Sequence, residues 1–541
     1  MIMKRYYIDQ IGGKREQQWK TLEHNGVKFP PEYEKHNIPV VYEGKEIILN
    51  KDAEEAATFY AREIESDNVN DKVFRDNFWK DWKKLLGKDH VVKSLENVDF
   101  RKIYDYLIKK KELKKNIKVD KQAVAAANEK YMYAILDGVK QPVGNYLVEP
   151  PGIFKGRGKN PLLGRIKPRI KPSDITINIG KKSKIPELPN GQSWGKIVHD
   201  QTGLWLASWK DVLTGKTKYV RFGAKSDVIA SSDNSKFDKA RKLKKNISKI
   251  RKINNENMRS DNDKIRQVST AIFFIDNFAL RIGNKKSKNE ADTVGVTSLR
   301  VEHVKLLPDR VIQLDFLGKD SVRYYNKLKL DKADEIVYEN INAFMKDKSP
   351  SEKLFDKITS SDVNKCLQTF MKGLTAKVFR TFNSSNLFQK ELDKLANTVE
   401  KLSDSDKISA LIDGHTRANG KVAVLCNHQK NVGKGSNKAL ENLDNRIKET
   451  KKKIKELKSA DKPNPKRIET HKSRLKVLVS KKKLKDEQKN ISLGTSKINY
   501  IDPRITVSFM KKYNIPIDKL FNKTLQEKFK WAMDTPADYK F

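Results

Sequence analysis

Apolar residues recur at helical spacing over long stretches of the chain. From Phe237 onward they occupy positions 237, 240, 243, 247 and 250, which share one helix face, and the opposite face is almost entirely lysine and arginine. This pattern predicts a helix that packs on one side and presents its basic side to solvent or to a polyanion. Residues 268–280 are apolar on nearly every face and predict a second, buried helix that ends at Arg281-Ile282-Gly283-Asn284. A guanidinium that leaves a core helix needs a partner.

Two other stretches have the shorter period that is typical of strands. Residues 194–222 alternate apolar and polar positions, with Leu206 and Ser208 expected on one face. Residues 311–325 predict two strands joined by the turn Gly318-Lys319-Asp320. We therefore expect Lys319 at the tip of a hairpin.

The first 150 or so residues mix helical and extended patterns, with aromatic residues among charges. The run Phe78-Trp79-Lys80-Asp81-Trp82 predicts an amphipathic helix with its tryptophans in the core. From Glu149 to Pro172, prolines and glycines forbid helix and leave lysines and arginines on a fixed loop. Those cations either follow a phosphate backbone or belong to an exposed connector, and the residues alone do not decide between the two.

The composition changes abruptly between Asn431 and Asn490, where 20 lysines and arginines stand against 8 aspartates and glutamates. Leucines and isoleucines keep a heptad-like spacing on either side of Asp461-Lys462-Pro463-Asn464-Pro465, which interrupts it. The segment predicts an antiparallel helical hairpin with a thin apolar seam and a basic exterior.

The overall charge adds a partner to this picture. The 541 residues carry 112 lysines and arginines against 69 aspartates and glutamates, a formal net charge of +43. The length indicates several domains. The charge indicates a polyanionic partner, nucleic acid first, although a lysine-rich, AT-biased genome explains part of it. Only Cys366 and Cys426 are present, which excludes a disulfide framework and a cysteine-based zinc site. Neither a signal peptide nor a membrane span is evident.

Six motifs stand out by their length and order. They are Pro150–Gly158, Ala279–Asn284, Asp315–Asp320, Gly373–Thr381, Leu425–Gln429 and Leu493–Tyr500. Taken singly, an arginine, histidine or tyrosine in any of them would more often be structural than catalytic. Together they resemble the eukaryotic type IB DNA topoisomerase I family, and the resemblance extends from Trp19 to Phe541.

The resemblance implies that Tyr500 attacks a DNA phosphodiester surrounded by Arg281, Lys319, Arg380 and His428. A phenol with an ordinary pKa near 10 needs positive charge or a base beside it. Two guanidiniums can hold the non-bridging oxygens, His428 adds a hydrogen bond, and Lys319 protonates the departing 5′-oxygen. The resulting 3′-phosphotyrosine conserves the energy of the broken bond, so we expect no need for ATP, a divalent metal or another cofactor.

Further motif residues are expected near the cleaved bond. The resemblance places Arg157, Asp320 and Asn499 beside it, where they border the site of the inhibitor camptothecin, and we expect sensitivity to that inhibitor. Other residues expected to contact DNA or border the inhibitor are Lys155, Gly156, Asn284 and Lys377.

The fold implied by the resemblance is a multidomain α+β protein, a bilobed C-shaped clamp that closes as a monomer around double-stranded DNA and serves replication and transcription. Its predicted parts are a mixed α/β DNA-binding cap and core lobe (1–225), a mainly helical catalytic core of the tyrosine recombinase and topoisomerase IB type (226–430), a basic antiparallel coiled-coil linker (431–490) and a small helical C-terminal domain with the nucleophile (491–541). The linker either lies near downstream DNA and slows its rotation or is a solvated spacer. Binding mainly to phosphates predicts weak sequence selectivity and strong salt dependence.

Two alternatives use the same residue types. A tyrosine recombinase commonly has His three residues before the second arginine, where this chain has Lys377, and keeps its nucleophile close to the last His or Trp, whereas a long basic segment separates His428 from Tyr500. A catalytically silent DNA- or chromatin-binding protein on the same scaffold is disfavoured because all five chemical positions are filled.

Location depends on the source of the chain. Family members usually carry a long charged amino-terminal region with nuclear-import signals, and this sequence begins almost at the core. A nuclear location through an internal basic run such as Arg241-Lys242-Leu243-Lys244-Lys245 is compatible with the sequence, and so is a viral origin with work in a viral factory or the cytoplasm.

Overall fold

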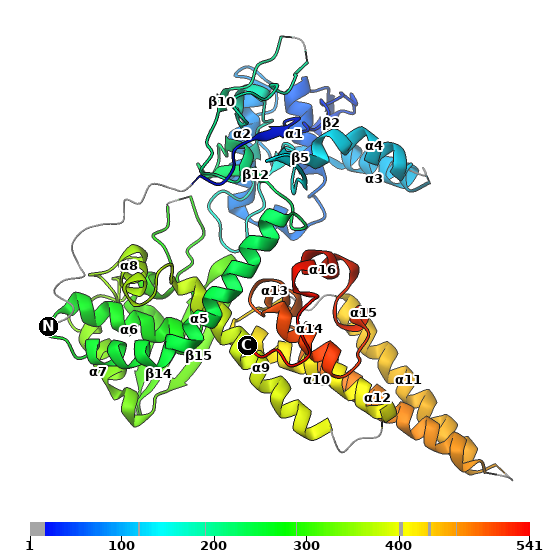
Figure 1. The fold of residues 1–541 in the computed structure, drawn as a ribbon. Coiled ribbons are helices and arrows are strands. Elements are labelled where there is room, and N and C mark those ends of the chain that lie inside the picture. The colour runs from blue at the N-terminus through cyan, green and yellow to red at the C-terminus, as the bar shows by residue number, and fades with distance from the viewer. Residues whose placement is uncertain are drawn as a thin grey trace. The chain divides into compact units, whose positions relative to one another are not determined.

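The computed structural model describes residues 17–116, 120–189, 191–287, 289–399, 404–430, 434–460 and 463–541. The start of the chain and parts of the predicted basic hairpin (431–433, 461 and 462) lie outside these ranges. The fold is mixed α/β and comprises two compact units, one of Met1–Ile229 with Lys286–Thr293 and one of Ala230–Lys285 with Val294–Phe541 (Figure 1). Each unit is described by itself.

The strands of the first unit form several small sheets. The largest has the order β10-β9-β11-β12, two others have the orders β1-β5-β6 and β3-β2-β4, and β7 pairs with β8. The strands are β1 (Leu22–His24), β2 (Val40–Tyr42), β3 (Lys45–Ile47), β4 (Val98–Asp99), β5 (Tyr133–Leu136), β6 (Val139–Pro142), β7 (Gly152–Ile153), β8 (Ile166–Lys167), β9 (Ile175–Asn178), β10 (Lys196–Val198), β11 (Trp205–Lys210) and β12 (Thr217–Arg221).

The strand β11 differs from the alternation predicted for it. Leu206, Ala207, Ser208 and Trp209 are all buried. The strand lies inside its sheet, between β9 and β12, and Leu206, Ala207 and Trp209 all belong to the core that includes Trp19. The register of β11 with β12 shifts between Trp205 and Ala207, and an irregularity of this kind interrupts the alternation of a strand.

The α-helices of the first unit that the structure describes are α1 (Lys51–Ala61), α2 (Lys72–Leu86), α3 (Arg101–Asn116) and α4 (Lys121–Met132). The predicted amphipathic helix is α2, and Phe74, Phe78 and Trp82 form its buried face. Trp82 donates its indole N–H to Ala53 O (2.9 Å) and is fully buried. Trp79 is only partly buried beside this cluster, so the expectation of two core tryptophans holds for one of them.

The second unit is mainly helical and contains one sheet of order β13-β14-β15. Its elements are α5 (Asp227–Asn257, which begins in the first unit), α6 (Asp263–Asn277), β13 (Val304–Leu307), β14 (Val311–Leu317), β15 (Arg323–Lys329), α7 (Glu335–Met345), α8 (Ser360–Phe370), α9 (Ala376–Val399), α10 (Asp404–Leu425), α11 (Lys434–Lys458), α12 (Pro465–Glu487), α13 (Leu493–Asn499), α14 (Pro503–Lys512), α15 (Ile517–Leu520) and α16 (Lys523–Lys528). The buried face of α5 consists of the predicted apolar positions and Asn254, and α6 is buried on nearly every face.

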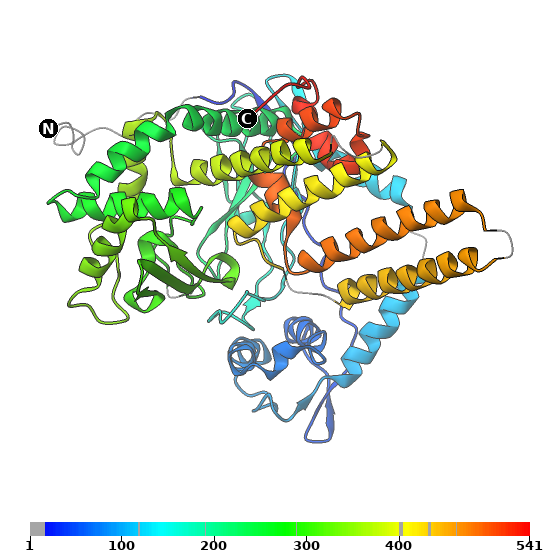
Figure 2. The ribbon, with the colours of Figure 1, turned by 90° about the horizontal axis from the view of Figure 1, so that it is seen from below.

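Two basic helices, α11 and α12, lie side by side in both views (Figures 1 and 2) and occupy the segment predicted as a helical hairpin. Their seam is thin, with Ile447, Leu478 and Leu484 as buried apolar residues. The segments before α11 and after α12 are hydrogen-bonded to each other. Lys430 N–H donates to Asn490 O (2.9 Å), and Ser492 N–H donates to His428 O (2.8 Å). Residues far apart in sequence, on the segment before α11 and on α13, are thereby brought together.

A close backbone approach fixes the loop between β7 and β8 on α2. Gly164 has a left-handed backbone (φ +82°), and a Cβ there would lie 2.0 Å from Phe74 O. Gly138 has nearly the same backbone (φ +80°) with nothing within 4 Å of its Cβ position. A comparison of alanine substitutions at Gly138 and Gly164 therefore separates the cost of a left-handed backbone from the cost of steric overlap.

We expect Gly138→Ala to lower the free energy of unfolding by about 1 kcal/mol, which is the cost of a left-handed alanine. Gly164→Ala is expected to lower it by about 1–3 kcal/mol more because of the overlap with Phe74 O. Urea unfolding of both variants, followed by tryptophan fluorescence, measures the difference. Equal losses in the two variants would contradict the close packing of Gly164 on α2.

Candidate active site

Tyr500 lies at the C-terminal end of α13 and is buried, with 6% of its surface exposed. Its hydroxyl accepts a hydrogen bond from Arg281 Nη1 (3.3 Å). The guanidinium carbon of Arg380 lies 5.0 Å from the centre of the phenol ring. The ring of His428 stacks on the phenol ring of Tyr500, with 5.4 Å between the ring centroids. The structure thus brings together four of the five residues that the sequence assigns to chemistry.

The two guanidiniums change the acidity of the phenol. Burial raises the pKa of Tyr500, but the charges and hydrogen bonds of Arg380 and Arg281 lower it by more, so the pKa lies below its ordinary value. A lowered pKa makes the phenolate, which is the nucleophilic form, more accessible near neutral pH. The arrangement is therefore that of an activated oxygen nucleophile.

Arg380 carries the most deeply buried charge of the site, with 4% of its surface exposed. Its Nη1 donates to Ala279 O, and its Nη2 donates to Cys426 O (3.1 Å). Its Nε has no hydrogen-bond partner, and within the described ranges neither Arg380 nor Arg281 forms an ion pair. A buried charge without a counter-charge is costly. The site can therefore accept an anion that arrives from outside.

Arg281 is positioned by a contact between two glycines. The N–H of Val296 donates to Arg281 O (2.9 Å), which joins the segment after α6 to residues 295–297. A Cβ on Gly295 would lie 2.5 Å from Gly283 N and 2.6 Å from Arg281 O. Gly283, the glycine of the Arg-Ile-Gly motif, has a left-handed backbone (φ +81°), and a Cβ on it would lie 2.8 Å from Gly295 Cα, so both positions require glycine.

His428 is a neutral imidazole in this site. Burial lowers its pKa to about 3, and the charges of Arg380 and Arg281 act in the same direction. Its Nδ1 lies 2.7 Å from Ser496 Oγ, and its Nε2 lies 3.5 Å from Arg380 Nη2. Because a guanidinium can only donate, Nε2 accepts in this arrangement and Nδ1 donates to Ser496.

Several residues with left-handed backbones flank the site. One lies two residues before Arg281, two follow Lys319 directly, and one immediately precedes His428. A left-handed L-residue costs roughly 1–2 kcal/mol, and less for Asn or Asp. Strain of this kind persists where surrounding contacts enforce it, and it concentrates at functional positions. The residues are Ala279 (φ 50°), Asp320 (φ 65°), Ser321 (φ 57°) and Asn427 (φ 52°).

Lys319 stands apart from the other four residues. It lies in the turn between β14 and β15, so the predicted hairpin is confirmed. Its side chain is exposed and, in the described part of the chain, makes no hydrogen bond or ion pair. The structure does not bring Lys319 into contact with the phenol, and its role in the chemistry stays a prediction.

Two buried serines support the nucleophile and were not singled out from the sequence. Ser385 Oγ donates to Tyr500 O (3.0 Å) and accepts from Asp502 N–H (3.0 Å). Ser496 binds His428 through its hydroxyl and accepts the N–H of Tyr500 through its carbonyl (2.9 Å). Ser496 falls inside the last motif, which could have indicated it, but nothing in the sequence marks Ser385.

The remaining predicted residues of the second unit lie on the surface. Asn284, Asp320, Lys377 and Asn499 are exposed. Asn499 donates its amide to Thr495 O (3.0 Å), one turn earlier on α13. Lys377 lies on α9, one turn before Arg380. Their contacts with DNA or an inhibitor stay predictions.

Several cations of the basic loop at 149–172 form ion pairs with carboxylates of the first unit, which the sequence did not predict. Lys155 pairs with Glu63, Arg157 is exposed, and Gly156 lies so close to Asn160 that a Cβ would come within 2.8 Å of it. Arg165 pairs with Asp81 on α2 (2.6 Å), and Arg169 pairs with Glu55 on α1 (2.7 Å). The cations at 165 and 169 therefore anchor the loop to α1 and α2, and whether the loop also contacts phosphates stays a prediction.

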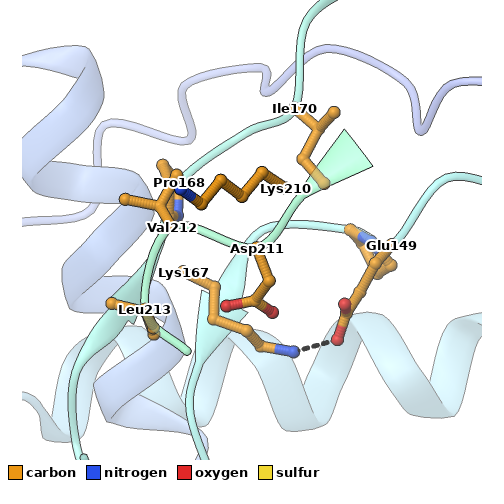
Figure 3. A pocket seen from close by; sticks show the side chains of 9 residues that line it. Glu149, Lys167, Pro168, Ile170, Lys210, Asp211, Val212 and Leu213 are labelled. Atoms are coloured by element: carbon orange, nitrogen blue, oxygen red, sulfur yellow. Dashed lines mark hydrogen bonds and ion pairs between the residues drawn. The ribbon is translucent and has the colours of Figure 1, made fainter. Parts of the chain in front are cut away.

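A cavity of about 30 Å³ lies beside this loop (Figure 3). Glu149 pairs there with Lys167 and Lys218, and Asp211 pairs with Lys218 (2.9 Å). The volume suits a single water molecule. The lining residues are Glu149, Pro150, Lys167, Pro168, Ile170, Lys210, Asp211, Val212 and Leu213.

Among the residues that the structure describes, no three His, Cys, Asp or Glu side chains gather in a group that could hold a metal ion. None of the helices in the described ranges combines the length and apolar character needed to cross a membrane. Cys366 and Cys426 are both buried and unpaired.

Comparison with known proteins covers nearly the whole chain. Three family models match it: the DNA-binding fragment of eukaryotic DNA topoisomerase I over residues 17–222, its catalytic core over 225–461, and a C-terminal topoisomerase domain over 472–541. DNA topoisomerase 1 alpha of Arabidopsis thaliana is 41% identical over 559 residues, 98% of this chain and 60% of that protein. DNA topoisomerase 1 of Homo sapiens is 40% identical over 560 residues, 97% of this chain and 72% of that protein. The chain thus spans less than two thirds of the plant relative.

The charge of Arg281 should be measurable in the acidity of Tyr500. We expect Arg281→Gln to raise the pKa of the phenol, because burial then acts against the charge of Arg380 alone. Fluorine NMR of protein labelled with 3-fluorotyrosine follows the titration, and Tyr500→Phe assigns the signal. Arg417→Gln, which breaks the pair with Glu487 (2.5 Å), is the control. An unchanged phenol pKa in Arg281→Gln would contradict the proposed activation.

Proposed function

The chain belongs to the eukaryotic DNA topoisomerase I family, and from that premise we propose that it relaxes supercoiled double-stranded DNA by cutting and resealing one strand through Tyr500. The observation that carries the proposal is the pair of guanidiniums around the buried phenol, neither of which has a carboxylate partner in the described ranges. A phosphodiester supplies the missing negative charge. The two guanidiniums also lie where they can stabilise the negative charge on the phosphoryl oxygens in the transition state.

Cleavage in this proposal is a transesterification, in which one phosphate ester bond replaces another. Tyr500 Oη forms a bond to phosphorus while the bond from phosphorus to O5′ breaks. The phenol proton passes to water, Lys319 gives a proton to O5′, and the strand departs as a 5′-hydroxyl. Resealing is the reverse reaction after the free end has turned about the intact strand.

Arg281 and Arg380 hold the non-bridging oxygens in this step. Arginine remains charged at every accessible pH and offers a planar set of donors. The unpartnered Arg380 Nε supports this role, because a phosphate oxygen would satisfy it. Loss of one such donor is expected to lower the rate by about 10²–10³-fold, as in other oxyanion-binding sites.

His428 donates a hydrogen bond to a phosphate oxygen in the complex. For this its Nε2 must carry the proton, so Nδ1 must accept from Ser496. The Ser496 hydroxyl can either donate or accept, and it therefore supports the imidazole in both tautomers. A neutral histidine with a pKa of about 3 keeps this ability across the physiological range.

We propose that the reaction needs neither ATP nor a divalent metal. The phosphotyrosine ester stores the energy of the broken bond, and the fixed cations of Arg281 and Arg380 supply the charge stabilisation that a metal ion would otherwise provide. Sensitivity to camptothecin, with Arg157, Asp320 and Asn499 at the edge of the inhibitor, belongs to the same proposal. A strand-transfer role like that of a tyrosine recombinase is disfavoured by family membership.

We also propose that the protein forms a C-shaped clamp, acts as a monomer on duplex DNA, and uses α11 and α12 as a linker near downstream DNA. A groove of about 380 Å³ between these helices is lined by Arg446, Lys481 and Lys485 among others, which suits a phosphate backbone.

The chain is expected to act where duplex DNA lies, which in a eukaryotic cell is the nucleus. The basic run 241–245 that suggested an import signal lies inside α5. Leu243 is fully buried, Arg241 stacks over Tyr539 at 5.0 Å, and Lys244 donates to Phe541 O. A receptor that reads an extended peptide would need another segment of the protein.

Relaxation of a supercoiled plasmid in EDTA without ATP tests the activity. We expect the wild type to relax the plasmid and Tyr500→Phe to leave it supercoiled, because the phenylalanine lacks the oxygen that bonds to phosphorus. Denaturing gels of labelled duplex should show a covalent protein–DNA product for the wild type alone. Relaxation by Tyr500→Phe at more than a trace of the wild-type rate would sink the assignment.

The salt dependence of binding tests the linker. With Tyr500→Phe and a short duplex, the logarithm of the binding constant should fall linearly with the logarithm of the salt concentration, by about 0.9 for each neutralised phosphate. If the linker contacts DNA, replacing Arg446, Lys481 and Lys485 by glutamine reduces the slope by up to about 0.9 for each lost contact. Fluorescence anisotropy between 50 and 200 mM salt, the range over which such contacts are normally resolved, gives both slopes. Identical slopes would leave the linker as a spacer.

A further inference from the structure

The turn that carries Lys319 is closed by its own backbone. Gly318 N–H donates to Val322 O (2.8 Å), and Ser321 N–H donates to Gly318 O (3.0 Å). Leu317 pairs with Arg323 across the hairpin immediately outside the turn. A shift of Arg323 therefore moves the whole turn, and the base of the Lys319 side chain moves with it.

Two side-chain amides hold the turn at this point. Asn427 Nδ2 donates to Arg323 O (3.2 Å), and Gln429 Nε2 donates to the same oxygen (3.3 Å). Gln429 Nε2 also donates to Asn427 Oδ1 (2.7 Å), so the two amides form one hydrogen-bonded unit. They flank His428 on either side in the sequence.

The segment that bears these amides is itself fixed. Gln429 forms an isolated bridge with Ile491, and Ser492 N–H donates to His428 O (2.8 Å), so the segment is tied to the start of α13. Asn427 has a left-handed backbone (φ 52°) and comes two residues after the end of α10. Asparagine is among the few residues that adopt this conformation at low cost, and it brings an amide as well.

The opposite strand of the hairpin has a second anchor. Leu317 O accepts the N–H of Val294 (2.8 Å), and Val294 directly precedes the glycine that packs on Arg281. The turn is thus held between the segment of Arg281 on one side and the segment of His428 on the other. Neither anchor touches Lys319 itself.

We propose that Asn427 and Gln429 are positioning residues for proton transfer: by holding Arg323 O they set where the Lys319 ammonium stands relative to the departing 5′-oxygen. The inference rests on the function proposed above and adds two residues to it. The Lys319 side chain is exposed and makes no hydrogen bond or ion pair within the described ranges, so its location depends on the backbone of the turn. The two amides join that backbone to the phosphate-binding segment.

A pair of duplex substrates isolates the proton transfer. One has the ordinary oxygen at the scissile 5′ position and the other has a bridging sulfur. A thiol is far more acidic than a sugar alcohol, since its pKa is near 8.5, and a thiolate therefore leaves without being protonated. Single-turnover cleavage at saturating protein compares the wild type with Asn427→Gly, Gln429→Met and the two changes combined. Glycine keeps the left-handed backbone available, and methionine keeps the length of glutamine without its donor.

On the oxygen substrate we expect the combined variant to cleave roughly 10–100-fold more slowly than the wild type, and Lys319→Ala to lose about 10²–10⁴-fold. On the sulfur substrate all of these variants should return to within roughly 3-fold of the wild type, because no proton is needed. Asn514→Gly is the matched control. It removes another asparagine with a left-handed backbone (φ 53°) from the same unit and should cleave both substrates at the wild-type rate.

The outcomes separate the two proposals. Equal slowing of the combined variant on both substrates, with Lys319→Ala rescued by sulfur, would overturn the positioning role and place the amides in the fold or in the phosphate cage. Failure of sulfur to rescue Lys319→Ala would overturn Lys319 as the proton donor, and the positioning role with it. Tyr500→Phe, which should form no covalent product with either substrate, tests the nucleophile independently.

Discussion

The guanidinium of Arg380, which has 4% of its surface exposed and no ion-pair partner among the described residues, is the constraint on which the site of the second unit depends. A buried cation is costly unless its donors are satisfied, and here the main-chain carbonyls of Ala279 and Cys426 accept from Nη1 and Nη2 while Nε has no partner among the described residues. Presenting those carbonyls requires unusual backbone. Ala279 takes a left-handed conformation, and the chain after Cys426 turns through the left-handed Asn427. The cost of folding this site is therefore carried by the backbone around it, and the free positive charge remains available for a phosphate.

Much of the fold could be predicted because its helices bury one regular stripe. The spacing from Phe237 to Ile250 fixed the buried face of α5, the continuous apolar run before Arg281 predicted α6, and the turn at Lys319 predicted the β14–β15 hairpin. Mixed α/β structure and membership of the topoisomerase I family also followed from the sequence. In each of these cases a local pattern and the tertiary environment demand the same residues.

Other features could not be predicted because they depend on partners distant in sequence. Nothing local marks Ser385 as the residue that binds the backbone on both sides of Ile501. The sequence did not predict that Arg165 and Arg169 form ion pairs with carboxylates on α2 and α1. The short segment Lys286–Thr293 belongs with the first unit although both of its neighbours belong with the second. The motif resemblance named Tyr500 and the three side chains that lie around it, but it did not single out the buried serines that bind their backbone and side chains.

The bonds of Ser385 have a mechanical consequence. They attach the main chain at Tyr500 and Asp502 to α9, and buried Asp502 in turn accepts from Arg504 (2.8 Å) and the Tyr539 hydroxyl (3.0 Å). The phenol itself contacts Arg281, Arg380 and His428. In the covalent intermediate proposed above, tension along the broken strand would pass through the phenol to the main chain on either side of Ile501 and from there into helix α9. The carboxy-terminal segment would then stay attached to the protein while the duplex rotates.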